Sequence, residues 1–189
     1  VENPFSVALE GDGFFQIRTE SGELQYTRDG SFEISPVANG NMLCTSDGNP
    51  VLDAYGNQII LPSNRVATDL VVNQDGTLAF PDGTGNPAVI TDANGRPVKF
   101  GIYQFNNPAG LSKEGSNNYS VTVASGAAVA ENGNAAVKQT KTHQYYTEAS
   151  NVDVANEMVN LIVAQRAYEM NSKAIQASDE MMQQANALR

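Results

Sequence analysis

Short apolar or alternating runs, separated by tight-turn dipeptides, fill the chain from Val7 to about Tyr146. The dipeptides tolerate the positive φ that hairpin turns need; they are Asp12-Gly13, Asp29-Gly30, Asn39-Gly40, Asp47-Gly48, Asp75-Gly76, Asp82-Gly83 and Asn94-Gly95. Because several runs alternate, each predicts a strand with one buried face. The predicted strands cover residues 14–18, 24–26, 31–34, 42–44, 51–52, 59–60, 70–72, 77–79 and 98–105.

The stretch before the C-terminal region carries weaker patterns. Residues 124–134 are small, polar and without period, which predicts a loop. Residues 137–146 favour either one polar strand or an extended connector.

A long helix is predicted after Ser150. Ser150 can cap its N-terminus with Asp153 at the third helical position, and no Gly or Pro follows up to Leu188. At about 1.5 Å per residue such a helix is roughly 55 Å long, well beyond the usual length in globular proteins. A helix of this length needs a partner along its side.

Apolar residues recur every seven positions along this helix, a period that keeps one stripe facing a neighbouring helix. The adjacent stripe turns polar after its first member, so a mixed interface with several neighbours is favoured over a simple zipper. We predict an assembly interface formed by Val154, Met158, Leu161, Ile162, Gln165, Tyr168, Ile175 and Met182. Arg166, Glu169 and Asn171 flank it, either as polar contacts to neighbours or as a solvated face.

The sequence holds no second long helix to cover this stripe. Three arrangements stay open: the helix folds back on the β region, it pairs with another subunit, or its natural partner segment is missing from this chain. The absence of an initiator Met makes the third attractive.

The predicted fold class is mainly β with a long C-terminal α-helix. An elongated antiparallel β domain of short strands and hairpins spans residues 1–146, and an assembly helix segment spans residues 147–189. The net charge of −10 disfavours nucleic acid and anionic lipid surfaces as partners. No apolar run approaches the ~20 residues of a membrane span, so we expect no membrane insertion.

Candidate chemistry is sparse. Cys44 and His143 are each unique, so a nucleophilic dyad is formally possible, but Cys44 follows two apolar residues and is typical of a core position. The Asp-rich stretches 47–49 and 92–95 lack the spacing of a calcium loop, and turn chemistry explains them. Residues 83–88 begin like a dinucleotide loop but lack its final Gly. We expect no catalytic residue, metal or cofactor.

Four ordered segments carry a resemblance to a known family. Gly11-Asp12-Gly13-Phe14-Phe15 and Tyr26-Thr27-Arg28-Asp29-Gly30-Ser31-Phe32 form the first two, and residues 105–126 contain Asn107-Pro108, Gly115 to Tyr119 and Ser125-Gly126. The fourth is residues 148–173, which include Gln165-Arg166-Ala167-Tyr168-Glu169-Met170-Asn171. Together they resemble the bacterial flagellar rod and hook family, and the fourth is most similar to its distal-rod branch. The hairpin motif residues are Gly13, Phe14, Phe15, Tyr26, Arg28, Asp29, Gly30 and Phe32.

The resemblance implies a structural subunit of the flagellar basal body, exported through the flagellar secretion channel and not an enzyme. In that family an N-terminal and a C-terminal helix line a tube, and copies stack into a hollow shaft that transmits torque and lets subunits pass. The implied partners are further copies, neighbouring rod and hook proteins and the export machinery. The family's N-terminal helix has no counterpart here. A proximal-rod or hook paralogue remains the alternative within the class, and an extracellular β-rich ligand-binding module the alternative outside it.

Overall fold

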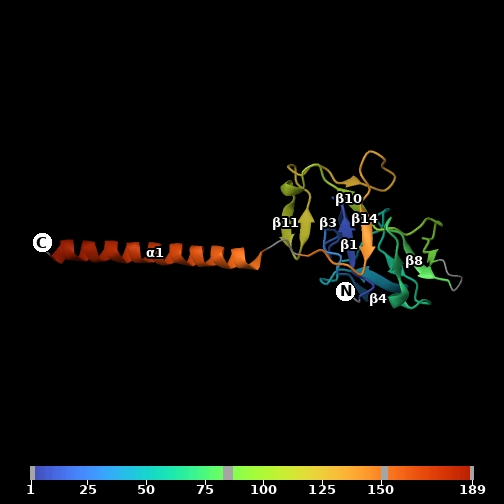
Figure 1. Cartoon of the computed structure of the whole chain (residues 1–189), viewed down its shortest axis with the longest axis horizontal. Helices are drawn as coiled ribbons and strands as arrows, with labels where there is room; N and C mark the ends of the chain where they lie inside the picture. The colour runs from blue at the N-terminus through green and yellow to red at the C-terminus, as the bar shows by residue number, and fades with distance from the viewer. Residues whose placement is uncertain (1–2, 83–86, 150–152, 188–189) are drawn as a thin grey trace. The chain divides into compact units, whose positions relative to one another are not determined.

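The protein is described by a computed structural model covering residues 3–82, 87–149 and 153–187. The chain divides into two compact units, Val1–Glu148 and Ala149–Arg189. The first contains the β-structure and the second contains the single helix α1 (Val154–Ala187) (Figure 1). The mainly antiparallel β fold with a long C-terminal helix is thereby confirmed.

The first unit is built from short strands in four small sheets, and every strand pair is antiparallel. The elements are β1 (Val7–Glu10), β2 (Phe14–Arg18), β3 (Leu24–Thr27), β4 (Glu33–Val37), β5 (Gly40–Cys44), β6 (Ile60–Leu61), β7 (Val71–Val72), β8 (Leu78–Pro81), β9 (Pro87–Val89), β10 (Ile102–Gln104), β11 (Ser112–Gly115), β12 (Asn118–Ser120), β13 (Val129–Ala130) and β14 (Lys141–Gln144), with 3-10 turns η1 (Ala67–Asp69) and η2 (Pro108–Gly110).

The largest sheet brings sequence-distant segments together in the order β11-β12-β3-β2-β10-β13. Separately, β1 pairs with β14, so the two ends of the first unit lie side by side (Figure 1). Two three-stranded sheets, β4-β5-β6 and β7-β8-β9, complete the unit.

One hairpin turn is used repeatedly in this unit. At residues 19–23, 45–49, 53–57, 73–77 and 92–96, the first residue's N–H donates to the carbonyl of the fifth, and the fourth residue's N–H donates to the carbonyl of the first. The fourth residue is always glycine with φ between +75° and +88°. A three-residue loop that ends in the left-handed region closes such hairpins, and only glycine enters that region without cost.

Two apolar clusters hold the strands together. The larger is centred on Phe15, Phe32 and Phe100, whose rings contact one another and are at most 1% exposed. The smaller contains Phe14, Tyr26 and Phe105, packed edge to face. Consecutive residues Phe14 and Phe15 point to opposite faces of β2, so each contributes to a different cluster.

Strands lie where the sequence predicts them at residues 14–18, 24–26 and 42–44. The loop prediction for residues 124–134 is wrong at Val129–Ala130, which form β13 against β10. The run at residues 98–105 is regular strand only over Ile102–Gln104, and its first part makes isolated bridges. Inside 137–146, the strand alternative is correct for Lys141–Gln144.

Helix α1 begins later than predicted. Asp153 lies just before it, where its carboxylate accepts the N–H of Ala155 at 2.9 Å and its carbonyl accepts the N–H of Glu157 at 3.0 Å. Asp153 is therefore the N-cap and not the third helical residue, since an Asp at that position satisfies one of the free N–H groups of the first turn. The cap predicted at Ser150 lies outside the described residues. In the part of the chain that the structure covers, no helix is long and apolar enough to cross a membrane.

Candidate functional site

The apolar stripe of α1 is exposed to solvent along its length. Exposed fractions run from 54% for Ile162 to 78% for Tyr168, and every described side chain from Asp153 to Gln184 is exposed. The other predicted interface residues, Val154, Met158, Leu161, Gln165, Ile175 and Met182, share this exposure. All of these side chains belong to helix α1 in the second unit.

The polar residues beside the stripe form one internal pair. Arg166 Nη1 lies 3.5 Å from Glu169 Oε2, one helical turn away, and both side chains are more than half exposed. Asn171 is also exposed. Exposed pairs of this kind contribute only about 0–1 kcal/mol to stability, so both groups are available for contacts elsewhere.

The aromatic residues of the hairpin motifs are structural. Phe14, Phe15, Tyr26 and Phe32 are each no more than 6% exposed. Burial raises the pKa of Tyr26, although the Gln16 amide that donates to its hydroxyl at 3.2 Å opposes this. These residues form the core of the first unit and offer no surface to a partner.

The motif glycines are required by close backbone approach. A Cβ on Gly30 would overlap the carbonyl oxygen of Val7, whose N–H donates to the Gly30 carbonyl at 3.0 Å. A Cβ on Gly13 would lie 2.5 Å from the Ile102 side chain and 2.7 Å from Thr140 Oγ1. Any side chain at either position would separate β1 or β2 from its neighbours.

Arg28 is the most connected side chain of the motifs. Its Nη1 donates to the carbonyls of Gly11 and Gly13, both at 3.0 Å, and its Nε donates to Glu148 Oε2 at 2.8 Å. The guanidinium also lies 5.6 Å from the centre of the Phe14 ring. It joins the β1–β2 turn to the last residue of the first unit.

Asp29 joins two family segments that are far apart in sequence. Its carboxylate accepts the Ser31 N–H at 3.0 Å and the Asn117 amide at 3.1 Å. Partial burial opposes ionisation, but these hydrogen bonds outweigh it and hold the pKa of Asp29 below its ordinary value. Asn117 itself has a φ of +60° in the β11–β12 turn, so Asp29 fixes a turn of unusual conformation.

A buried carboxylate at Glu131 was missed by sequence reasoning. Glu131 is 3% exposed, and its carboxylate accepts the Thr140 N–H at 2.8 Å, the Thr140 hydroxyl at 2.6 Å and the Gln104 amide at 2.7 Å. Buried charges need such partners. The network connects the segment before β14 to β10. Glu131 lies in a stretch without hydrophobic periodicity, so no sequence pattern indicated that its carboxylate is buried.

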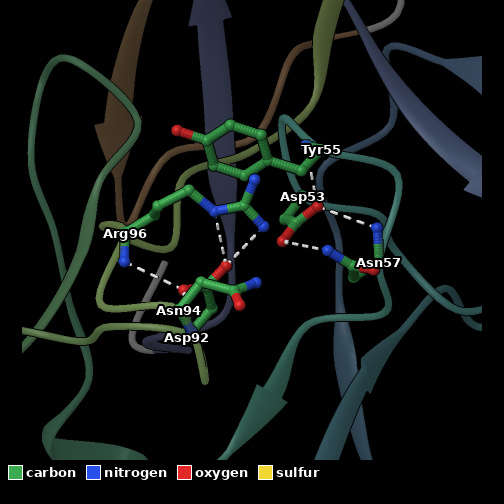
Figure 2. A network of polar contacts seen from close by, with 6 residues as sticks. All are labelled: Asp53, Tyr55, Asn57, Asp92, Asn94 and Arg96. Carbon is green, nitrogen blue, oxygen red and sulfur yellow. Dashed lines mark hydrogen bonds and ion pairs between the residues drawn. The ribbon is translucent and has the colours of Figure 1, made fainter.

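Two of the repeated turns meet in a second polar network (Figure 2). Asp53 accepts the N–H groups of Tyr55 and Asn57 at 2.8 Å each. Arg96 donates through Nε and Nη2 to one oxygen, Asp92 Oδ2, at 2.8 and 2.7 Å. The Arg96 guanidinium stacks 3.9 Å from the centre of the Tyr55 ring. The hydrogen bond from the backbone N–H of Arg96 is the main cause that lowers the pKa of the Asp92 carboxyl.

A groove of about 480 Å³, lined by both polar and apolar side chains, lies beside this network. Its lining includes Asn39, Asp53, Gln58, Asp92 and Asn94. Both aspartates already accept hydrogen bonds from their own turns. Among the described residues, no group of three metal-ligating side chains is found.

Cys44 and His143 have separate partners. Cys44 is buried and donates to the Glu33 carbonyl at 3.5 Å, and burial together with the Glu33 charge raises the pKa of its thiol. His143 Nε2 lies 2.6 Å from Glu10 Oε2 across the β1–β14 pair. This hydrogen bond is the largest cause that lowers the pKa of Glu10.

Two family models match the chain. Residues 8–80 match the flagellar hook protein FlgE/F/G D1 domain, and residues 143–188 match the flagellar basal body rod FlgEFG protein C-terminal region. The first covers the hairpin motifs and the second begins in β14 and covers α1. The chain belongs to the flagellar rod and hook protein family.

Within this family the chain is FlgG-like. It is 40% identical over 187 residues to the flagellar basal-body rod protein FlgG of Borreliella burgdorferi, covering 97% of this chain and 64% of the relative. The FlgG of Caulobacter vibrioides is 36% identical over 100% of this chain and 66% of its own length. The flagellar hook-basal body complex protein FlhP of Bacillus subtilis is 37% identical over 89% of this chain and 59% of its own length. The chain thus spans slightly less than two thirds of these curated relatives.

Proposed function

We propose that this chain is a structural subunit of the bacterial flagellar basal-body rod, and that it acts by assembly through α1 and not by catalysis. The observation that carries the proposal is a 34-residue helix whose apolar side chains are exposed at every described position up to Met182. Exposed apolar stripes of this length mark interaction surfaces. Membership of the rod and hook family supports assembly into the flagellar axial structure.

The apolar stripe supplies the association energy. Fully burying a side chain such as Leu161, Ile162 or Ile175 is worth about 1.5–3 kcal/mol, and each is more than half exposed here. Partial burial of the seven apolar interface residues is therefore of the same order as the several kcal/mol that association costs. The partners are further copies of the chain in a helical homo-oligomer and neighbouring rod and hook proteins.

Each unit has its own mechanical role in this proposal. Residues 1–146 form an outer rod domain, stiffened by two aromatic clusters and five closed hairpin turns. Residues 147–189 contribute to a tube-lining core. Rigid units of this kind suit an extracytoplasmic shaft that transmits torque from motor to hook and conducts exported subunits. The chain itself reaches this shaft through the flagellar export machinery.

The distal rod is favoured over other places in the axial structure. FlgG relatives recur among the matches, which supports the distal-rod branch over a proximal-rod or hook paralogue. A ligand-binding module would use the groove beside Asp53 and Asp92, but both carboxylates already accept hydrogen bonds from their own turns. We therefore assign no cofactor and no catalytic residue.

The test is a double substitution, Leu161→Asp with Tyr168→Asp, introduced into the chromosomal gene of the source bacterium. Burying two unpaired charges costs several kcal/mol, so rods should fail to assemble and swimming should be lost. Asn160→Asp with Ser178→Asp adds the same charge at polar positions of the same helix and should leave swimming intact. The first unit of both variants should unfold at the urea concentration of the unaltered chain. Normal swimming by the Leu161/Tyr168 variant would refute the assembly role of this stripe.

A further inference from the structure

The segment by which the chain leaves the first unit is held at both of its ends. We call residues 145–148 the exit segment. It follows β14, and its last residue, Glu148, is the last residue of the first unit. Contacts at Tyr145 and at Glu148 bracket it.

The first contact is a backbone anchor. Tyr145 has a φ of +67°, a left-handed conformation that is uncommon for an aromatic residue, and its N–H donates to the Ser6 carbonyl at 2.8 Å. Just before it, the Gln144 amide donates to the carbonyls of Pro4 and Leu70, both at 2.7 Å. The turn out of β14 is thus specified by tertiary contacts.

The second contact is the ion pair between Arg28 Nε and Glu148 Oε2 at 2.8 Å. The two side chains are 28% and 45% exposed, and most pairs at this exposure contribute little because two long side chains must be ordered to form them. Arg28 differs because its Nη1 already donates to the carbonyls of Gly11 and Gly13. Forming the ion pair therefore requires only the Glu148 side chain to become ordered. The two carbonyls are uncharged, so the Glu148 carboxylate is the group that neutralises the positive charge of Arg28.

We propose that Arg28 and Glu148 form a clasp that fixes the path of the exit segment along the first unit. The pair joins residues 120 positions apart, one in each of the two matched family regions. Among the described residues, no other ion pair holds the chain between Tyr145 and the end of the first unit.

Backbone ¹⁵N relaxation of the soluble chain tests the clasp. Order parameters of residues 146–149 should be about 0.8 in the unaltered chain and fall below about 0.6, the range of flexible backbone, in Glu148→Ala. The matched control is Glu169→Ala, which breaks the exposed Arg166–Glu169 pair and should leave the exit segment unchanged. Because Glu148 is exposed, its replacement should leave the order parameters of β2 and β3 at their original values.

Two results would overturn the proposal: order parameters below about 0.6 in the unaltered chain, or values for residues 146–149 that Glu148→Ala does not lower. The relaxation measurement requires no assembly, so it stands apart from the swimming assay of the Leu161/Tyr168 variant. The two measurements therefore separate the two proposals: relaxation data report on the clasp alone, and the swimming assay reports on the assembly role of the apolar stripe alone.

Discussion

Replacing Phe15 with alanine should remove the side chain that links three parts of the first unit. Phe15 lies in β2 and is 0% exposed. Its ring lies 5.0 Å from that of Phe32 and 5.2 Å from that of Phe100, both in edge-to-face geometry. Phe32 lies just before β4 and Phe100 lies in the segment before β10. The Phe15 ring therefore connects β2 to two segments that are far apart in the sequence.

The expected cost follows from complete burial. Phe→Ala substitutions in closed cores cost about 3–5 kcal/mol, against a total stability of about 5–15 kcal/mol for a domain of ordinary size. Edge-to-face pairs add about 0.5–1.5 kcal/mol beyond the buried area. We therefore expect Phe15→Ala to cost about 4 kcal/mol, and Phe15→Leu and Phe100→Leu to be coupled by about 1 kcal/mol.

Urea unfolding monitored by tyrosine fluorescence is a suitable assay, because the chain contains seven Tyr and no Trp. Phe14 provides the control, since it lies in the smaller cluster with Phe105 at 5.5 Å. Phe14→Leu and Phe100→Leu should be additive within about 0.3–0.5 kcal/mol. A cost of Phe15→Ala below about 2 kcal/mol, or no coupling between Phe15 and Phe100, would refute the linking role of Phe15. Coupling between Phe14 and Phe100 would refute the separation into two clusters.

Two further predictions concern the hairpin motif. Gly30→Ala should cost about 2–4 kcal/mol, because its Cβ would overlap the Val7 carbonyl and disturb the adjacent hydrogen bond; Gly48→Ala, at φ +82° with open space around it, should cost only about 1–2 kcal/mol in the same urea titration. Asp29 has a lowered pKa in the folded protein, so its contribution to stability is present above the unfolded value of about 3.9 and is lost as the pH falls through the lower folded value. Asp29→Asn should therefore reduce the loss of stability between pH 6 and pH 3, measured as the shift in urea midpoint, and an equal shift in both proteins would contradict the role of this carboxylate.

The elements that sequence reasoning identified are those with strong local signals. The glycines at positive φ close hairpins through their own backbone geometry, so Asp47-Gly48 and Asp75-Gly76 indicate turns without knowledge of the rest of the chain. Helix α1 was predictable because its residues lack Gly and Pro and repeat every seven positions. Asp153 is the N-cap and not the third helical residue that the sequence predicts, since Ser and Asp are both favourable cap residues and local sequence does not decide between them.

Elements that depend on distant partners were predicted only in part. Strand β14 is Lys-Thr-His-Gln, which has no apolar alternation, so the sequence left a polar strand and an extended connector both open; pairing with β1, more than 130 residues away, makes it a strand. Strand β11 is exposed at every position, so no burial pattern revealed it. The roles of Glu131 and Arg28 likewise arise from partners in other strands, because a polar side chain has no periodicity from which its partner can be read.

The distribution of apolar residues around α1 bears on the kind of assembly. Two positions along a helix rotate by about 200°, so Val163 lies nearly opposite Leu161 and Met170 nearly opposite Tyr168. Val163 is 61% exposed and Met170 is 68% exposed, which gives the helix apolar side chains on both faces. A helix with apolar side chains on several sides buries most of them only when neighbours surround it. A simple pair of helices would leave one of these faces in water, whereas packing among several neighbours covers both, so the proposed assembly predicts more than one neighbour for each helix.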